Sequence, residues 1–118
     1  MGELADLLTE AGRQWEPELK QRLQGMLGGI FRAYLPQAWV FRTEQETATL
    51  LVEKDGHVEV RADATKSPDV TVEVPFRRLA TAFRARSRQA MPPGELKVTT
   101  HTSKGKTAFD YLRSRLGI

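Results

Sequence analysis

The first part of the chain carries apolar residues at helical spacing. One face of a helix over residues 3–15 holds all of its large apolar residues, which predicts an amphipathic helix. These residues are Leu4, Leu7, Leu8, Ala11 and Trp15. Pro17 then interrupts the pattern, which resumes beyond it as far as Tyr34. We therefore expect two helices, or one kinked helix, in an N-terminal helical segment spanning residues 1–36.

Beyond Pro36 the apolar pattern changes to the period of two that is typical of strands. This alternation predicts five short strands, over residues 37–43, 47–54, 57–63, 69–74 and 95–100. Asp55-Gly56 lies between the second and third of these segments and predicts a hairpin there. Alternation on both sides of this turn gives one apolar and one polar face, so we expect an antiparallel sheet with a solvated face.

Two further helices are expected around the last strand. Pro75 opens a helix over residues 75–90, which Pro92-Pro93-Gly94 ends, and residues 102–105 lead into a final helix. The expected order is α, α, β, β, β, β, α, β, α. This order predicts a single α+β domain over residues 1–118, with a mostly antiparallel five-stranded sheet and one crossover helix before the last strand.

Composition excludes several classes of protein. The chain has no cysteine, so disulfides, thiolate metal sites and thiol nucleophiles are excluded. No apolar run approaches the roughly 20 residues that a membrane-spanning helix needs. The first residues are acidic and no apolar segment of a secretory signal follows them. We therefore expect a cytoplasmic protein.

Positive charge is concentrated towards the C-terminus. Residues 74–118 hold ten basic residues and only two acids. In the expected helix 75–90, Arg77, Arg84 and Arg88 form a stripe beside the apolar face. Such a stripe could contact phosphates of nucleic acid or another anionic surface, but arginine stems also cover apolar surface while their charges stay in water. No aromatic residues for base stacking are interleaved with these arginines.

A Gly-Lys-Thr sequence follows the expected last strand. Lys104 and Lys106 flank Gly105 at the expected start of the final helix, where free backbone N–H groups attract anions. A phosphate loop would also need a glycine at the position of Thr100, so we do not expect nucleotide hydrolysis. The two remaining interpretations are a weak anion site and a helix-capping turn.

Residues for catalysis or metal binding are sparse. His57 and His101 are the only histidines, and neither has a second ligand at metal-binding spacing. The acids Glu44, Glu46, Glu59 and Asp63 could in principle act as general acids or bases, but solvated charge on the strand faces is the explanation we favour. We expect no catalytic residues, no metal and no cofactor.

Two segments resemble the sterol carrier protein type 2 (SCP2) family. Residues 67–76 (SPDVTVEVPF) are similar to the "Ala-Asp-Val-Thr" strand of that family and the helix that follows it. Residues 91–98 (MPPGELKV) are similar to its "Gly-Lys-Leu-Lys-Ile" strand before the closing helix. The resemblance covers residues 37–118. Pro68 and Glu95 depart from the pattern, standing where the family has Ala and Gly.

The resemblance implies a twisted sheet covered by helices on one face, with an apolar tunnel between the sheet and the C-terminal helices. A lipid, fatty acyl or sterol-like molecule would bind in this tunnel without a covalent step. The residues expected to line it, which could equally form an ordinary filled core, are Phe76, Leu79, Phe83, Met91, Leu96, Val98, Phe109 and Leu112.

Three functions remain open at this point. The first is non-enzymatic binding or transfer of an apolar ligand, with peripheral contact to an anionic surface. The second is binding of nucleic acid or another anionic surface through the arginine-rich helix 75–90, although nucleic acid is not the partner we expect first. The third is self-association into a homodimer through the N-terminal helices.

Overall fold

The computed structural model describes residues 2–25, 33–85 and 97–116, with only the backbone described at residues 22, 82–85 and 111–116. Its described elements are α1 (Glu3–Gln24), β1 (Gln37–Arg42), β2 (Thr47–Val52), β3 (Val58–Arg61), β4 (Val70–Glu73), α3 (Phe76–Ala85), β5 (Lys97–Thr100) and α4 (Ser103–Leu116).

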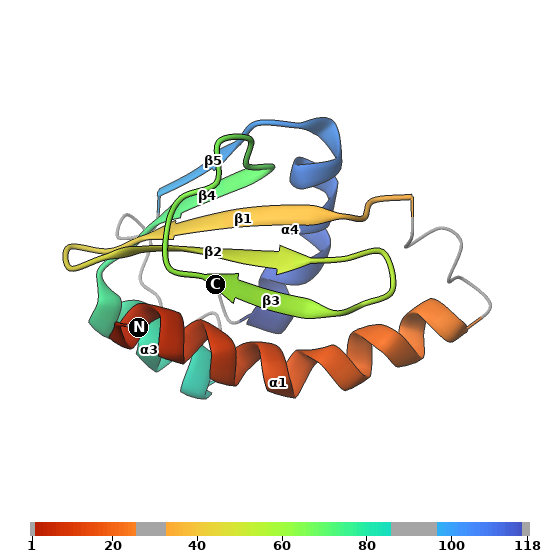
Figure 1. The fold of residues 1–118 in the computed structure, drawn as a ribbon, viewed down its shortest axis with the longest axis horizontal. Helices are drawn as coiled ribbons and strands as arrows, with labels where there is room; N and C mark the ends of the chain where they lie inside the picture. The colour runs from red at the N-terminus through yellow and green to blue at the C-terminus, as the bar shows by residue number, and fades with distance from the viewer. Residues whose placement is uncertain (1, 26–32, 86–96, 117–118) are drawn as a thin grey trace.

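The five strands form one mixed sheet in the order β3-β2-β1-β4-β5 (Figure 1). Three of the four neighbouring pairs are antiparallel, and only β1 and β4 run parallel. The α+β class and the mostly antiparallel sheet are confirmed. The expected crossover helix is wrong, because α3 joins β4 to β5, and these two neighbours are antiparallel.

The Asp55-Gly56 turn joins β2 to β3 as the sequence predicts. Gly56 has a φ of 90°, a conformation that suits glycine because it has no Cβ. Asp55 Oδ1 accepts a hydrogen bond from the backbone N–H of His57 at 2.9 Å. The turn therefore fixes the register in which Leu51 faces Glu59.

The connection from β3 to β4, residues 62–69, crosses the sheet face opposite to the helices (Figure 1). It has to cross because β3 and β4 lie on opposite sides of the β1–β2 pair. Thr49 anchors it by donating to the carbonyl of Asp63 at 2.6 Å and accepting from Thr65 N–H at 3.1 Å. Thr49 and Val40 are buried, so this face is only partly solvated.

The three described helices share one hydrophobic core against the other face. The register sets Trp39 beside Leu50 and Val70, and sets Phe41 beside Ala48 and Val72. Helix α1 packs on β2, β3 and α3, whereas α4 packs on β4 and β5. The core residues that the helices contribute include Leu4, Leu7, Leu8, Ala11, Leu79, Ala80, Ala108 and Phe109.

Helix α1 continues through Pro17 as one element of 22 residues. Proline lacks the N–H that would bond to the carbonyl four residues earlier, and the axis of α1 bends near its middle (Figure 1). Pro17 therefore does not divide Glu3–Gln24 into two helices, in agreement with the expectation of one kinked helix at this position. Helix α1 ends at Gln24, and the described residues 33–36 are not helical.

Candidate functional site

Four of the expected lining residues lie in the described core. Leu79 and Phe109 are buried members of the core cluster, and Phe76 and Val98 are half-buried against it. They come from α3, α4 and β5, so the fold does bring these separate segments to one apolar layer. Met91 and Leu96 lie outside the described residues, as do the side chains of Phe83 and Leu112.

Trp39 of β1 faces this layer although it was not among the expected lining residues. Its ring lies 5.6 Å from that of Phe109, centroid to centroid, with a 41° tilt between the planes. Its indole N–H donates to Gln37 Oε1 at 3.0 Å, which satisfies the polar atom of an otherwise apolar side chain. The alternation that predicted β1 already placed Trp39 on the apolar face of the strand. This alternation was the feature of the sequence that could have identified Trp39 as a lining residue.

Gln37 is itself buried and holds the start of β1 against α4. Its amide nitrogen donates to the carbonyl of Tyr34 at 2.6 Å and to that of Lys104 at 3.1 Å. The Gln37 amide also accepts the hydrogen bond from Trp39, so both its nitrogen and its oxygen are paired with protein groups. A buried amide needs such partners because no water reaches it.

Asp69 is the acid of the segment that resembles the SCP2 strand, and it acts here as a structural anchor. Its side chain is buried. Oδ2 accepts from the N–H of Ala38 at 2.9 Å, and Oδ1 accepts from the hydroxyl of Thr102 at 2.8 Å. Asp69 therefore links β1 to the start of α4, beside the ammonium of Lys104 at 3.8 Å.

The Gly-Lys-Thr segment forms a helix cap. Thr102 Oγ1 accepts from the N–H of Gly105 at 3.0 Å, and Thr102 O accepts from the N–H of Lys106. Lys104 Nζ donates to the carbonyl of Pro36 at 2.8 Å. The helix begins at Ser103, so residues 103–105 belong to α4 instead of leading into it.

The remaining basic candidates are divided between described and undescribed residues. Arg77 and Lys106 are exposed. The side chain of Arg84 and the whole of Arg88 lie outside the described part of the chain. The structure therefore does not test the stripe of three arginines, and nothing in the comparisons below supports binding of nucleic acid through it.

Two of the acids considered for acid–base chemistry accept hydrogen bonds from the first backbone N–H groups of helices. Glu46 accepts from the backbone N–H groups of Leu4 and Ala5 in α1, and Glu44 accepts from the N–H of Phe76 in α3. Both lie in the turn between β1 and β2. Negative side chains at helix N-termini are stabilised by the unpaired N–H groups there, so these acids have a structural role.

The two histidines lie in separate places. His57 Nδ1 lies 3.0 Å from Glu16 Oε1, and His101 Nε2 forms a 2.9 Å hydrogen bond with the hydroxyl of Thr71. Within the described residues, no three His, Asp or Glu side chains gather as metal ligands. Within the same residues, no helix is long and apolar enough to cross a membrane.

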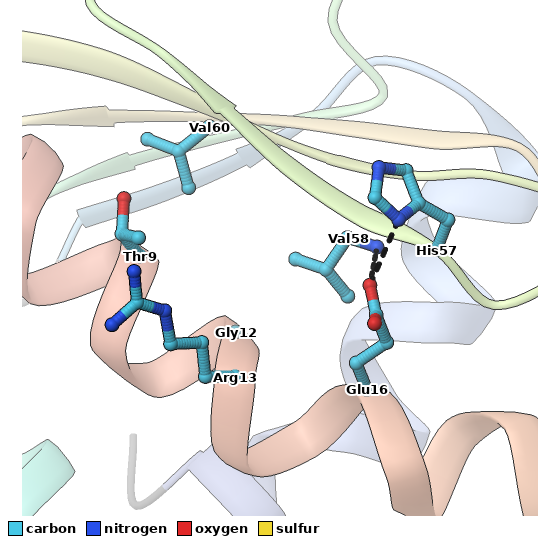
Figure 2. A pocket seen from close by; sticks show the side chains of 7 residues that line it. All are labelled: Thr9, Gly12, Arg13, Glu16, His57, Val58 and Val60. Atoms are coloured by element: carbon cyan, nitrogen blue, oxygen red, sulfur yellow. Dashed lines mark hydrogen bonds and ion pairs between the residues drawn. The ribbon is translucent and has the colours of Figure 1, made fainter.

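A pocket of about 240 Å³ lies between α1 and β3 (Figure 2). Its lining consists of Thr9, Gly12, Arg13, Glu16, His57, Val58 and Val60. Glu16 Oε1 accepts from the N–H of Val58 at 2.7 Å. This hydrogen bond, with the nearby charges of Lys20 and His57, holds the pKa of Glu16 below its ordinary value of 4.5, against the opposing effect of partial burial. Sequence reasoning missed this pocket because it depends on how α1 packs against β3.

Comparison with known proteins finds likeness in structure only. No family model and no curated protein matches the chain. Among solved structures, a conserved Thermus thermophilus protein described as possibly a sterol carrier protein has 11% identity and a TM-score of 0.48, with 92% of this chain and 80% of that one covered. Sterol carrier protein 2 from Yarrowia lipolytica, in its apo form, has 17% identity and a TM-score of 0.43, with 96% and 89% covered.

Part of a much larger enzyme is also similar. A sec-alkylsulfatase from Pseudomonas sp. has 18% identity and a TM-score of 0.47, but the match covers 64% of this chain and only 12% of that one. The ubiquinone synthesis protein UbiJ-SCP2 matches over nearly its whole length, with 91% of this chain and 95% of that one covered, 17% identity and a TM-score of 0.54. The mixed five-stranded sheet with helices on one face is therefore the SCP2-like fold that the two sequence segments predicted.

Proposed function

We propose that this protein binds or transfers an apolar ligand, of lipid, fatty acyl or sterol-like type, between its sheet and helices α3 and α4, without catalysing a reaction. The observation that carries the proposal is the apolar layer in which Leu79 of α3, Phe109 of α4 and Trp39 of β1 meet. The SCP2-like fold, shared with UbiJ-SCP2, supports it.

The chemistry of the described core suits an uncharged hydrocarbon. The buried polar side chains of the described residues are Gln37, Asp69 and, on the other face of the sheet, Thr49, and each is satisfied by hydrogen bonds within the protein. A ligand in this layer would therefore contact carbon, and each CH₂ group removed from water contributes about 0.8 kcal/mol. Binding of this kind needs no catalytic group.

Uptake of a fatty acid can be followed through Trp39. A Trp15→Phe variant leaves Trp39 as the only tryptophan, because the chain has two. A polyene fatty acid that accepts energy from tryptophan should quench Trp39 on binding. Native mass spectrometry of the same sample, followed by extraction, should show a retained acyl chain. A protein that retains no lipid and takes up no added fatty acid would disprove the proposal.

The position of the ligand can be tested with two matched valines. Val98 of β5 and Val58 of β3 are both half-buried against the core, but only Val98 lies among the expected lining residues. We expect Val98→Thr to weaken fatty acid binding about five-fold, equivalent to about 1 kcal/mol for a poorly satisfied hydroxyl. Val58→Thr should leave binding unchanged. Equal effects of both variants would contradict the proposed position.

A further inference from the structure

The free edge of the sheet at β3 offers backbone groups to a further strand. Glu53 N–H donates to His57 O, and paired residues alternate along an antiparallel ladder. Glu59 and Arg61 therefore bond to β2, whereas Val58 and Val60 direct their N–H and C=O groups away from it. No described residue accepts from the N–H of Val60. The edge thus presents the N–H of Val60 and the carbonyls of Val58 and Val60, whereas the N–H of Val58 is already bonded to Glu16.

Helix α1 runs beside this edge and closes it into a groove. The floor of the α1–β3 pocket is formed by Val58 and Val60, and Thr9 and Gly12 form the helix side. A Cβ at Gly12 would lie 2.8 Å from Val58 Cγ1, so glycine allows the helix to approach the strand closely. With a volume of about 240 Å³, the pocket has room for a side chain that points from an added strand towards α1.

The two charged groups on the helix side differ in how they are paired. Glu16 already accepts from the edge N–H of Val58 and interacts with His57 and Lys20. Arg13 lies three residues earlier, is exposed, and extends towards Thr9 and Val60 (Figure 2). No described residue forms an ion pair with Arg13. At the Val58 end of the groove, Glu16 supplies an acceptor for the edge N–H. At the Val60 end, no described residue supplies an acceptor for the N–H of Val60 or for the guanidinium of Arg13.

We propose that the groove between α1 and β3 binds an extended peptide segment with an acidic group. The peptide adds as a strand to β3, places an apolar side chain over Val58 and Val60, and sets its carboxylate against Arg13. A peptide is the ligand class that fits, because the N–H of Val60 and the outward carbonyls of Val58 and Val60 remain to be paired, and a peptide backbone supplies both an acceptor and donors for them. The groove shares no residue with the expected apolar lining, so this proposal stands apart from the proposed function.

A displayed library of random ten-residue peptides, selected on the full chain, provides the probe. We expect enriched peptides to alternate apolar and polar residues around one acid, and synthetic copies to shift the amide NMR signals of residues 58–61. N-methylation of peptide amides that face β3 should weaken binding about ten-fold or more, whereas methylation of the outward amides should not. Failure to enrich any sequence over an empty support would overturn the proposal.

The role of charge is tested by a pair of arginine variants. Arg13→Gln should weaken the affinity for the acidic peptides about two- to five-fold, as is typical of the loss of an exposed ion pair. Arg61→Gln is the control, because Arg61 bonds to β2 and pairs with Glu59 at 3.7 Å outside the groove. Equal effects of the two variants would contradict the assignment to Arg13. A concentration-dependent dimer that Arg13→Gln abolishes, measured by analytical ultracentrifugation, would instead assign the groove to a second copy of the chain and overturn the proposal.

Discussion

Glu46 accepts a hydrogen bond from the backbone N–H of Leu4 at 2.9 Å across 42 residues of sequence. Its second carboxylate oxygen accepts from the N–H of Ala5 at 3.2 Å, and Glu44 in the same turn accepts from the N–H of Phe76. One turn between β1 and β2 therefore caps two helices, one that precedes the first strand and one that follows the fourth strand. This arrangement fixes the starts of α1 and α3 relative to each other.

Loss of the Glu46 carboxylate should destabilise the protein. Glu46→Ala removes the acceptor for two N–H groups of α1, and loss of a helix N-cap typically costs about 1 kcal/mol. Urea unfolding measures this change. Gln45→Ala is the control, because Gln45 is exposed in the same turn and takes part through its backbone N–H. An equal loss in both variants would show that the turn itself, and not the cap, is responsible.

The low pKa of Glu16 predicts a pH-dependent contribution to stability. Because the folded-state pKa lies below the unfolded value, the contribution is present above about pH 4.5 and is lost as the pH falls through the folded-state pKa. Glu16→Gln should therefore lower the urea midpoint near pH 7 and leave it close to wild type once the pH lies below the folded-state pKa. Glu10→Gln, exposed on the same helix, should show no such difference. A gap between Glu16→Gln and wild type that persists in acid would refute this origin.

Removal of the Asp69 carboxylate should lower the free energy of unfolding more than removal of a surface carboxylate does. Asp69→Ala leaves the N–H of Ala38 and the hydroxyl of Thr102 without their acceptor, and an unsatisfied buried group costs about 1–3 kcal/mol. Asp63→Ala provides the comparison, because its side chain is exposed and its carbonyl, which Thr49 uses, is retained. Chemical denaturation of the two variants should separate them. Similar values would mean that Asp69 does not anchor α4.

Two glycines should respond differently to alanine. A Cβ at Gly105 would overlap the backbone carbonyl of Asp69, which cannot move without breaking its bond to His101 N–H. We expect Gly105→Ala to destabilise the protein by about 1–3 kcal/mol. At Gly12 the nearest atom is a methyl of Val58, which must shift to make room, but alanine is the better helix former by about 1 kcal/mol, so Gly12→Ala should cost less than Gly105→Ala. Thermal unfolding measures the stability of both variants. A lower unfolding temperature for Gly12→Ala than for Gly105→Ala would contradict this prediction.

Local pattern was sufficient for most elements of the fold. The alternation around Trp39 predicted β1 and its inward face, and Asp55-Gly56 predicted the hairpin between β2 and β3, because both features depend on residues close in sequence. Pro17 did not end α1, since packing of its apolar face outweighs one lost hydrogen bond. The expected lining residues Leu79 and Phe109 do share one core, but the local pattern did not show that Trp39 would lie against Phe109.

By itself, the sequence determined which segments are helix or strand, which of their faces are apolar, and that the chain resembles the SCP2 family. These properties follow from spacing, turn residues and side-chain polarity over a few positions. Only the tertiary structure decided the parallel pairing of β1 with β4, the capping of α1 by Glu46, the anchoring of α4 by Asp69 and the groove beside β3. Each of these depends on contacts between residues far apart in sequence, whose partners are chosen by how the helices pack on the sheet.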